Sequence, residues 1–245
     1  MTDTSIIDIK NRYTESVKWI AQFEASNCDK LVLDAGAGEQ RARAFFKNNK
    51  YISQDFGEYK GGGTPFDIRG IWDRKWDSEQ CDILSDICHI PVEDQTFDPI
   101  LCFEVIEHVP EPLRAIKELA RLLKPHGKLL ITAPNLCAAH QEPFFYYSGF
   151  SDRFFIDAVT KVAPEIELIY LGTERNFTQA HLGELKTLSH SQKNPLLRFS
   201  VTLCVSALKG ILSLLALAPG FKQPKSCSGF FAIFERKQSA QPIKT

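Results

Sequence analysis

The 245-residue sequence predicts an α/β protein built on a doubly wound, mostly parallel sheet. Three observations predict this class: short apolar strands alternate with amphipathic helices, the alternation covers residues 30–135, and a glycine turn follows the first strand. Strands of a parallel sheet are covered on both faces, so they are expected to be continuous apolar runs. The length suits one large domain, or one domain with a substantial insertion.

The composition narrows the function classes. Hydrophobic residues make up 44% and charged residues 24%, and the net charge of -1 argues against a general nucleic-acid binder. The seven cysteines are scattered without a C-x-x-C pair, so we predict neither a disulfide framework nor a metal site. The first residues lack the apolar core of a signal peptide, so we expect a cytoplasmic location.

The first strand and its turn organise the prediction. Residues 31–33 are apolar, Asp34 ends the run, and Gly36 and Gly38 provide a turn without Cβ atoms. A helix is expected directly afterwards. Together, the strand, the glycine turn and the expected helix resemble a nucleotide-binding βα unit, in which the ligand lies over the carboxyl end of the strand. Many α/β proteins need such a turn for structural reasons alone, so the rest of the chain has to decide.

Periodicity and turn residues place the other elements in chain order. The predicted helices cover 6–24, 39–48, 112–123 and 151–163, and the predicted strands cover 51–55, 82–84, 97–104, 128–133, 165–171 and 229–235. The helix over 6–24 is expected to pack on the sheet, with covering of the site as the alternative. We expect one domain with four parts: a helical cap over 1–29, a core over 30–171, a helical insertion over 172–228 and a last strand over 229–236.

Four acidic residues stand at or just beyond predicted strand ends: Asp34, Asp55, Asp86 and Glu104. In a parallel sheet these ends share one edge, which is where ligands bind in open α/β folds. Asp55 is suited to accept hydrogen bonds from a ribose diol, and Asp86 from an exocyclic amine. Turn formation or helix capping is the structural alternative.

Four stretches resemble the class I S-adenosylmethionine-dependent methyltransferases of type 11 or type 12/23. They read LVLDAGAG, YISQD, SDICHIPVEDQTFDPILCFEVIEHVPEP and LLKPHGKLLITAPN. The resemblance covers about residues 30 to 135 and implies a Rossmann-like sheet with helices on both faces and an antiparallel last strand. It implies S-adenosylmethionine as the cofactor. It also implies that Asp34, Gly36 and Gly38 border the methionine part, Asp55 the ribose, Asp86 and Ile87 the adenine, and Glu104 the floor near the sulfonium.

One departure concerns the glycine turn. The family usually has a third glycine where this chain has Gln40. Two alternatives stay open: a nicotinamide-dependent oxidoreductase, and a catalytically silent cofactor-binding subunit. The missing glycine and Glu39 near the phosphate position count against the first, because a dinucleotide needs room for its pyrophosphate. A degraded site at Gln40 is the argument for the second.

The acceptor is expected to be a small molecule, a sugar or a lipid-linked compound, methylated at a hydroxyl oxygen. His108 is the nearest candidate for a general base, and His140 is a second one. Phe144, Tyr146 and Tyr147 lie in the loop expected to overhang the acceptor. For His108 and the three aromatic residues, a structural role is the alternative.

Residues 196–218 have the length of a membrane span, but polar side chains recur on one helical face and Lys209 lies near the middle. We expect an amphipathic helix that either contacts a membrane surface or packs within the protein or in a homodimer.

Overall fold

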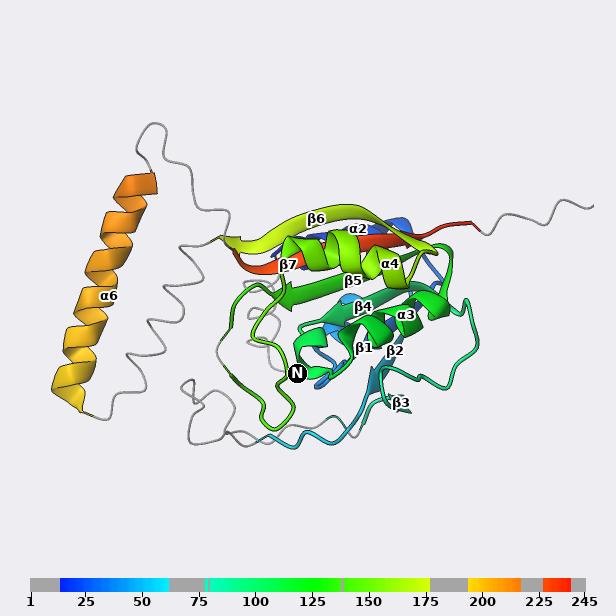
Figure 1. Ribbon diagram of the computed structural model, residues 1–245, viewed down its shortest axis with the longest axis horizontal. Coiled ribbons are helices and arrows are strands. Elements are labelled where there is room, and N and C mark those ends of the chain that lie inside the picture. Colours follow the sequence, from blue (N-terminus) through cyan, green and yellow to red (C-terminus); the bar gives the residue numbers. More distant parts are fainter. Residues whose placement is uncertain are drawn as a thin grey trace, which may run out of the picture.

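The computed structural model describes residues 14–61, 78, 80–137, 139–176, 194–216 and 227–238, and they contain a seven-stranded sheet of order β3-β2-β1-β4-β5-β7-β6 (Figure 1). Neighbours from β3 to β5 pair in parallel, and β7 pairs antiparallel with β5 and with β6. The predicted doubly wound fold with an antiparallel last strand is confirmed. The strands are β1 Leu31–Ala35, β2 Lys50–Asp55, β3 Ile83–Leu84, β4 Phe97–Phe103, β5 Leu123–Pro134, β6 Ile166–Asn176 and β7 Cys227–Arg236.

Alternate residues of the central strands feed two separate cores. Leu33 and Ile131 belong to the core under α3 (Pro112–Leu122), whereas Val32 and Leu130 belong to the core under α2 (Thr14–Ser26). All four side chains are fully buried. Both faces of the central strands are therefore covered, which explains why these strands are continuous apolar runs in the sequence.

Helices lie on both sides of the sheet. Figure 1 shows α3 and α4 (Thr160–Val162) on one face and α2 on the other. Ile20 of α2 is 1% exposed and packs in the second core, so the prediction that the first helix packs on the sheet is confirmed for its described part. Residues 6–13 of that predicted helix lie outside the described residues. The helix predicted over 151–163 contains a π-helical turn, η3 (Phe154–Val159).

The α-helix predicted over 39–48 is wrong. The chain forms only a short 3-10 helix there, η1 (Arg41–Phe45), which follows Gln40 in a left-handed conformation with φ of 55°. That conformation interrupts an α-helix beginning at Glu39. Further along, the carboxylate of Glu24 accepts hydrogen bonds from the backbone N–H groups of Lys47 and Asn48, which ends the helical run before β2.

The insertion before β7 starts later than predicted, because β6 continues to Asn176 along β7. Within the insertion the structure describes α6 (Pro195–Ala216), and the remaining residues 177–193 and 217–226 lie outside the described residues. Figure 1 shows α6 beside the sheet, on neither of its faces. Among the helices of the described ranges, none combines the length and the apolarity that crossing a bilayer requires.

Candidate active site

The four acidic residues meet at one edge of the sheet. Asp34 lies near the end of β1, Asp55 ends β2, Asp86 follows β3 by two residues, and Glu104 follows β4 directly. Their strands are neighbours and parallel, in the spatial order β3, β2, β1, β4. The sheet thus brings these four residues to the same edge, where their strands end, as expected from the sequence. We call Asp34, Asp55, Asp86 and Glu104 the acidic edge.

The glycine turn fits closely against this edge. Gly36 has φ of 72°, and a Cβ atom there would lie 2.4 Å from a methyl carbon of Val105, so a side chain would have to displace the segment after β4. The N–H of Gly38 donates to Asp55 at 2.9 Å, and the N–H of Gly57 donates to the other oxygen of Asp55 at 2.9 Å. Asp55 therefore holds two loops together and retains lone pairs on both oxygens for a ligand.

Asp34 is buried and shares a hydrogen bond with Tyr51. The pKa of Asp34 is raised to about 6: burial is the largest cause, a hydrogen bond donated by the Tyr51 hydroxyl opposes the rise, and the nearby Asp55 adds to it. The pKa of the Tyr51 hydroxyl is raised by burial and by the Asp34 charge, so the tyrosine stays a donor. A carboxylate held in this way is destabilised without a cation, which is typical of a functional site.

The other two acids differ in exposure. Asp86 is exposed, and one of its oxygens accepts the N–H of Cys88 at 2.8 Å, whereas the adjacent Ile87 is 7% exposed and belongs to the core. Glu104 has φ of 53°, and its N–H contacts the carbonyl and the hydroxyl oxygen of Thr132, each at 3.1 Å. The strained backbone at Glu104 turns the chain sharply out of β4 at the acidic edge.

Gln40 has contacts of its own. Its amide donates to the carbonyl of Gln80 at 3.0 Å and accepts from Arg43 at 2.9 Å. Its φ of 55° is the conformation that a glycine would adopt without strain. Only a five-residue 3-10 helix follows, so the helix N-terminus on which a dinucleotide pyrophosphate rests is missing after this turn.

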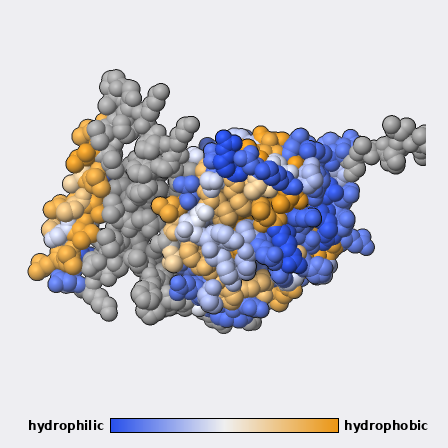
Figure 2. All heavy atoms as spheres, viewed as in Figure 1, coloured by the Kyte–Doolittle hydropathy of each residue, from blue (hydrophilic) through white to orange (hydrophobic). Residues whose placement is uncertain are grey.

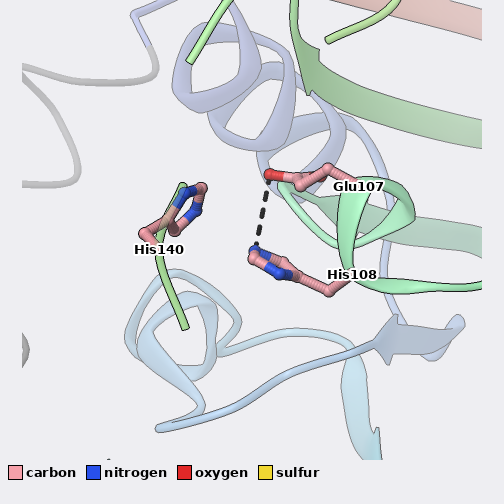
Figure 3. A group of neighbouring side chains, drawn as sticks. All are labelled: Glu107, His108 and His140. Atoms are coloured by element: carbon pink, nitrogen blue, oxygen red, sulfur yellow. Dashed lines mark ion pairs between the residues drawn. The ribbon is translucent and has the colours of Figure 1, made fainter. Parts of the chain in front are cut away.

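A second group of side chains lies beyond β4: Glu107, His108 and His140 (Figure 3). Their ligand-type atoms all lie within 4.8 Å of one another, and Glu107 Oε1 is 3.8 Å from His108 Nε2. Glu107 is fully buried, and neither of its oxygens has a hydrogen-bond partner among the described residues. Both histidines could be predicted as candidates from the sequence, but Glu107 was missed, although it stands beside His108 in the EVIEH stretch.

His108 is held in one orientation. A carbonyl oxygen only accepts, so Nδ1 must carry the proton that it donates to the Phe144 carbonyl at 2.7 Å. The pKa of His108 is lowered to about 4: burial is the largest cause, the nearby His140 adds to the lowering, and the hydrogen bond to Phe144 opposes both. The ring is therefore neutral near pH 7, and the lone pair of Nε2 faces Glu107 and His140.

The loop after β5 is fastened onto the segment that carries these residues. The N–H groups of Tyr146 and Tyr147 donate to the Glu107 carbonyl at 3.0 and 3.1 Å, and the Tyr147 hydroxyl donates to the Pro110 carbonyl at 2.9 Å. Phe144 packs edge-on against Phe56, which follows Asp55. Tyr147 thus has a structural contact, Tyr146 is 48% exposed, and Phe144 connects the loop to the acidic edge.

The structure also has an open depression of about 570 Å³, which does not include the acidic edge. It is lined by His89, Ile90, Pro91, Val92, Glu93, Glu118 and Arg121. Arg121 is already paired with Glu118 at 2.7 Å and with Asp94 at 2.5 Å. We do not assign a site to this depression.

Known proteins resemble this chain in sequence. Residues 71–131 match the model of a family described as a methyltransferase domain. An uncharacterised protein of Methanocaldococcus jannaschii is 33% identical over 117 residues, which cover 48% of this chain and 46% of that protein. A ubiquinone biosynthesis O-methyltransferase of Coxiella burnetii is 48% identical over 50 residues, 20% of this chain and 21% of that enzyme. The chain thus spans less than half the length of these curated relatives.

Solved structures agree in fold. A protein of Galdieria sulphuraria, provisionally described as a sarcosine dimethylglycine methyltransferase, aligns with a TM-score of 0.51 and 15% identity over 93% of this chain and 86% of that chain. At this identity the likeness concerns the fold alone. The matched segment and the strand order 3-2-1-4-5-7-6 confirm the resemblance inferred from the sequence motifs. In residues 71–131 and in the strand order of its sheet, this chain resembles the class I S-adenosylmethionine-dependent methyltransferases.

Proposed function

We propose that this protein transfers the methyl group of S-adenosylmethionine to a hydroxyl oxygen of a small-molecule, sugar or lipid-linked acceptor. The acidic edge beside the glycine turn is the observation that carries the proposal. S-adenosylmethionine is the methyl donor that the matched family implies, and its sulfonium and amino group are cationic. Carboxylates that are costly to hold without a cation suit such a ligand.

The residues at the edge fit the parts of this cofactor. The methionine part would lie beside Asp34 along the turn of Gly36 and Gly38, both of which have positive φ. Asp55 would accept from the ribose hydroxyls with the lone pairs that its two backbone contacts leave over.

The adenine would lie at the β3 end of the edge, and the sulfonium would lie near β4. The exposed carboxylate of Asp86 would accept from the adenine amine, with Ile87 at its side. Glu104 would form the floor near the sulfonium.

Methyl transfer does not require the protein to form a covalent bond with either substrate. The cofactor, when bound, supplies an activated methyl carbon, and the acceptor oxygen displaces its sulfur in line. Catalysis then depends on positioning the acceptor and on excluding water. We assign both tasks, positioning the acceptor and excluding water, to the loop of residues 140–150, which is hydrogen-bonded to Glu107 and Pro110. Phe144 and Tyr146 are the side chains proposed to contact the acceptor, and Tyr147 is a further candidate.

The choice of oxygen as the acceptor atom has two supports. One curated relative is named as an O-methyltransferase, and His108, with Nδ1 donating to the Phe144 carbonyl, keeps Nε2 as a hydrogen-bond acceptor. A general base works best with a pKa near the working pH, and the pKa of about 4 makes His108 a weak one. His108 and His140 are therefore proposed to help position the acceptor, and not to take its proton.

The single-domain organisation with a cap, a core, an insertion and a last strand is part of this proposal. The pairing of β7 with β5 supports it, because the chain returns to the same sheet after the insertion. The predicted cytoplasmic location stays a prediction from the sequence.

Calorimetry tests the proposed function. S-adenosylhomocysteine is expected to bind in the micromolar range and NAD is expected not to bind; the opposite result would refute the proposal. Asp55→Ala is expected to weaken S-adenosylhomocysteine binding by about 1 to 3 kcal/mol through loss of charged hydrogen bonds. Because Asp55 also holds Gly38 and Gly57, Asp55→Asn and a thermal melt check the fold. Asp157→Ala, at a half-exposed carboxylate of η3, is the matched control.

A catalytically silent subunit would bind the cofactor and fail at the next step. Incubation with S-adenosylmethionine and a panel of phenols, sugars and polyprenyl alcohols separates the two cases. Formation of S-adenosylhomocysteine that depends on an acceptor supports the enzyme, whereas binding without turnover on the whole panel favours the silent subunit.

A further inference from the structure

The geometry points to a divalent transition-metal site formed by Glu107, His108 and His140, at which the acceptor hydroxyl is bound and activated. The three residues come from two segments, the 3-10 helix η2 (Ile106–His108) after β4 and the loop after β5. Figure 3 shows their side chains converging from both segments. The metal site stands independently, and the role for the acceptor rests on the proposed function.

The buried carboxylate of Glu107 is the first argument. It is 0% exposed, and among the described residues it makes no hydrogen bond through either oxygen. Leaving a buried polar group without a partner is costly, and a carboxylate is the most costly kind. Its separation of 3.8 Å from His108 Nε2 is too long for a hydrogen bond. A cation between these atoms would satisfy the carboxylate.

The orientation of His108 is the second argument. Histidines that bind metals usually donate their other ring N–H to a carbonyl or a carboxylate, which fixes the tautomer and aims the lone pair at the ion. His108 has this arrangement, with Nδ1 donating to the Phe144 carbonyl at 2.7 Å. The same loop brings His140, whose ring centroid lies 4.8 Å from that of His108.

The residue types indicate which metals fit. Two imidazoles and one carboxylate form the ligand set of catalytic zinc sites, and they also suit divalent iron or manganese. Bonds of ~2.1 Å in a tetrahedral site would separate ligand atoms by roughly 3.4 Å. The present separations of up to 4.8 Å therefore require a movement of about 1 Å, which rotation of the half-buried His140 side chain would supply.

Such an ion would leave at least one coordination position for the acceptor. A bound hydroxyl becomes more acidic and releases its proton to water. The oxygen then forms a bond to the methyl carbon while the S–CH₃ bond breaks, and the bonding electron pair stays on sulfur. The products are the methyl ether and neutral S-adenosylhomocysteine. The metal keeps its oxidation state, and His108 need not accept a proton.

Cobalt binding to the full-length protein tests the site. After removal of metals with EDTA, Co²⁺ is titrated and followed by calorimetry and by absorption. We expect one Co²⁺ per chain with the visible bands of a four- or five-coordinate ion and without intense near-ultraviolet thiolate bands. Thiolate bands would place the metal at cysteines and overturn the inference, as would the absence of binding below millimolar concentrations.

Variants locate the metal. Glu107→Gln and His140→Ala are each expected to weaken Co²⁺ binding by about 10- to 100-fold or more, since even outer contacts of metal ligands have effects of that size. His126→Ala is the matched control, because His126 is 63% exposed and pairs with Glu235 on the strand edge instead. If Glu107→Gln fails to fold, His140→Ala carries the test. Unchanged affinity in His140→Ala overturns the site.

Binding of S-adenosylhomocysteine to the metal-free protein separates the two proposals. Cofactor binding without metal binding refutes the metal site and leaves the proposed function standing. Metal binding without cofactor binding refutes the proposed function and leaves the site standing.

Discussion

Asp34 connects the chemistry of the site to the stability of the protein. Its pKa of about 6 in the folded protein lies above the ordinary value of 3.8, so the folded chain keeps a proton that the unfolded chain releases. Stability from this residue is therefore highest below about pH 4 and falls as the pH rises toward 6. The difference corresponds to roughly 3 kcal/mol. A residue kept at such a cost is expected to serve binding.

We predict that Asp34→Asn stabilises the ligand-free protein and weakens cofactor binding. Asparagine resembles the protonated acid and still accepts from Tyr51, so the free energy of unfolding at pH 7.5 should rise by about 1 to 3 kcal/mol. The gain should shrink at pH 4.5, where the folded wild type is itself protonated. Urea denaturation of both proteins at the two pH values, with calorimetry for the cofactor, measures this.

Asp98→Asn is the control of opposite sign. Burial raises the pKa of Asp98, but hydrogen bonds from Lys124 at 2.9 Å and from the Leu31 N–H at 3.0 Å outweigh it and hold the pKa below its usual range. This residue therefore stabilises the fold above the unfolded pKa, and the contribution is lost as the pH falls. A destabilised Asp34→Asn protein at pH 7.5 would contradict the account of Asp34.

Single residues show where sequence reasoning ended. Asp34, Asp55 and Glu104 could be placed because strand ends are visible as the end of an apolar run. The contact of Gln40 with Gln80 could not be predicted, since it depends on how a segment forty residues away in sequence returns to the turn. Glu107 was missed because a glutamate beside a histidine gives no sign of burial. Glu107 is buried because the loop after β5 covers it, with the N–H groups of Tyr146 and Tyr147 bonded to its carbonyl.

Among the elements, those with strong patterns were predicted best. The helix α3 ends within one residue of its prediction, because its apolar face is unbroken and Lys-Pro follows it. The α-helix expected after the glycine turn was wrong, since Gln40 has a left-handed conformation and only a 3-10 helix follows it. The length of β6 was underestimated because its second half is determined by pairing with β7, some fifty residues away in sequence.

We predict that the loop of residues 140–150 is held in place by the hydroxyl of Tyr147. Tyr147→Phe removes the hydrogen bond to the Pro110 carbonyl and is expected to destabilise the loop by about 1 kcal/mol. Hydrogen exchange of the Tyr146 and Tyr147 amides, which donate to Glu107, should quicken accordingly. Tyr146→Phe, at a side chain 48% exposed, should leave the exchange unchanged. Equal rates in wild type and Tyr147→Phe would show that the loop is held by other contacts.

The molecule as a whole combines a packed sheet with a helix that exposes apolar side chains. Figure 2 shows this apolar surface along α6. Its most exposed members are Leu196, Leu197, Phe199, Leu203, Ile211 and Leu214. The polar side of α6 carries Arg198 and Lys209, and the helix has no acidic residue. The sequence predicted the helix and its row of polar residues. It could not predict what the exposed leucines bind, because neither candidate, a membrane surface or a second copy of the chain, leaves a distinct pattern in the sequence.

We predict that α6 binds the surface of anionic membranes, which would suit a lipid-linked acceptor. A helix with two cations and an exposed apolar side combines attraction to anionic lipid with burial of leucine. Vesicles containing phosphatidylglycerol should sediment the protein, and neutral vesicles should do so less. Leu203→Ser with Leu214→Ser should weaken binding at least tenfold, since burying each leucine contributes about 1.5 to 3 kcal/mol. Leu136→Ser, the same change at a leucine 68% exposed elsewhere, should not weaken binding.

A dimer in analytical ultracentrifugation that dissociates in the double variant, without vesicle binding by the wild type, would contradict this prediction and would assign the apolar side of α6 to a second copy of the chain.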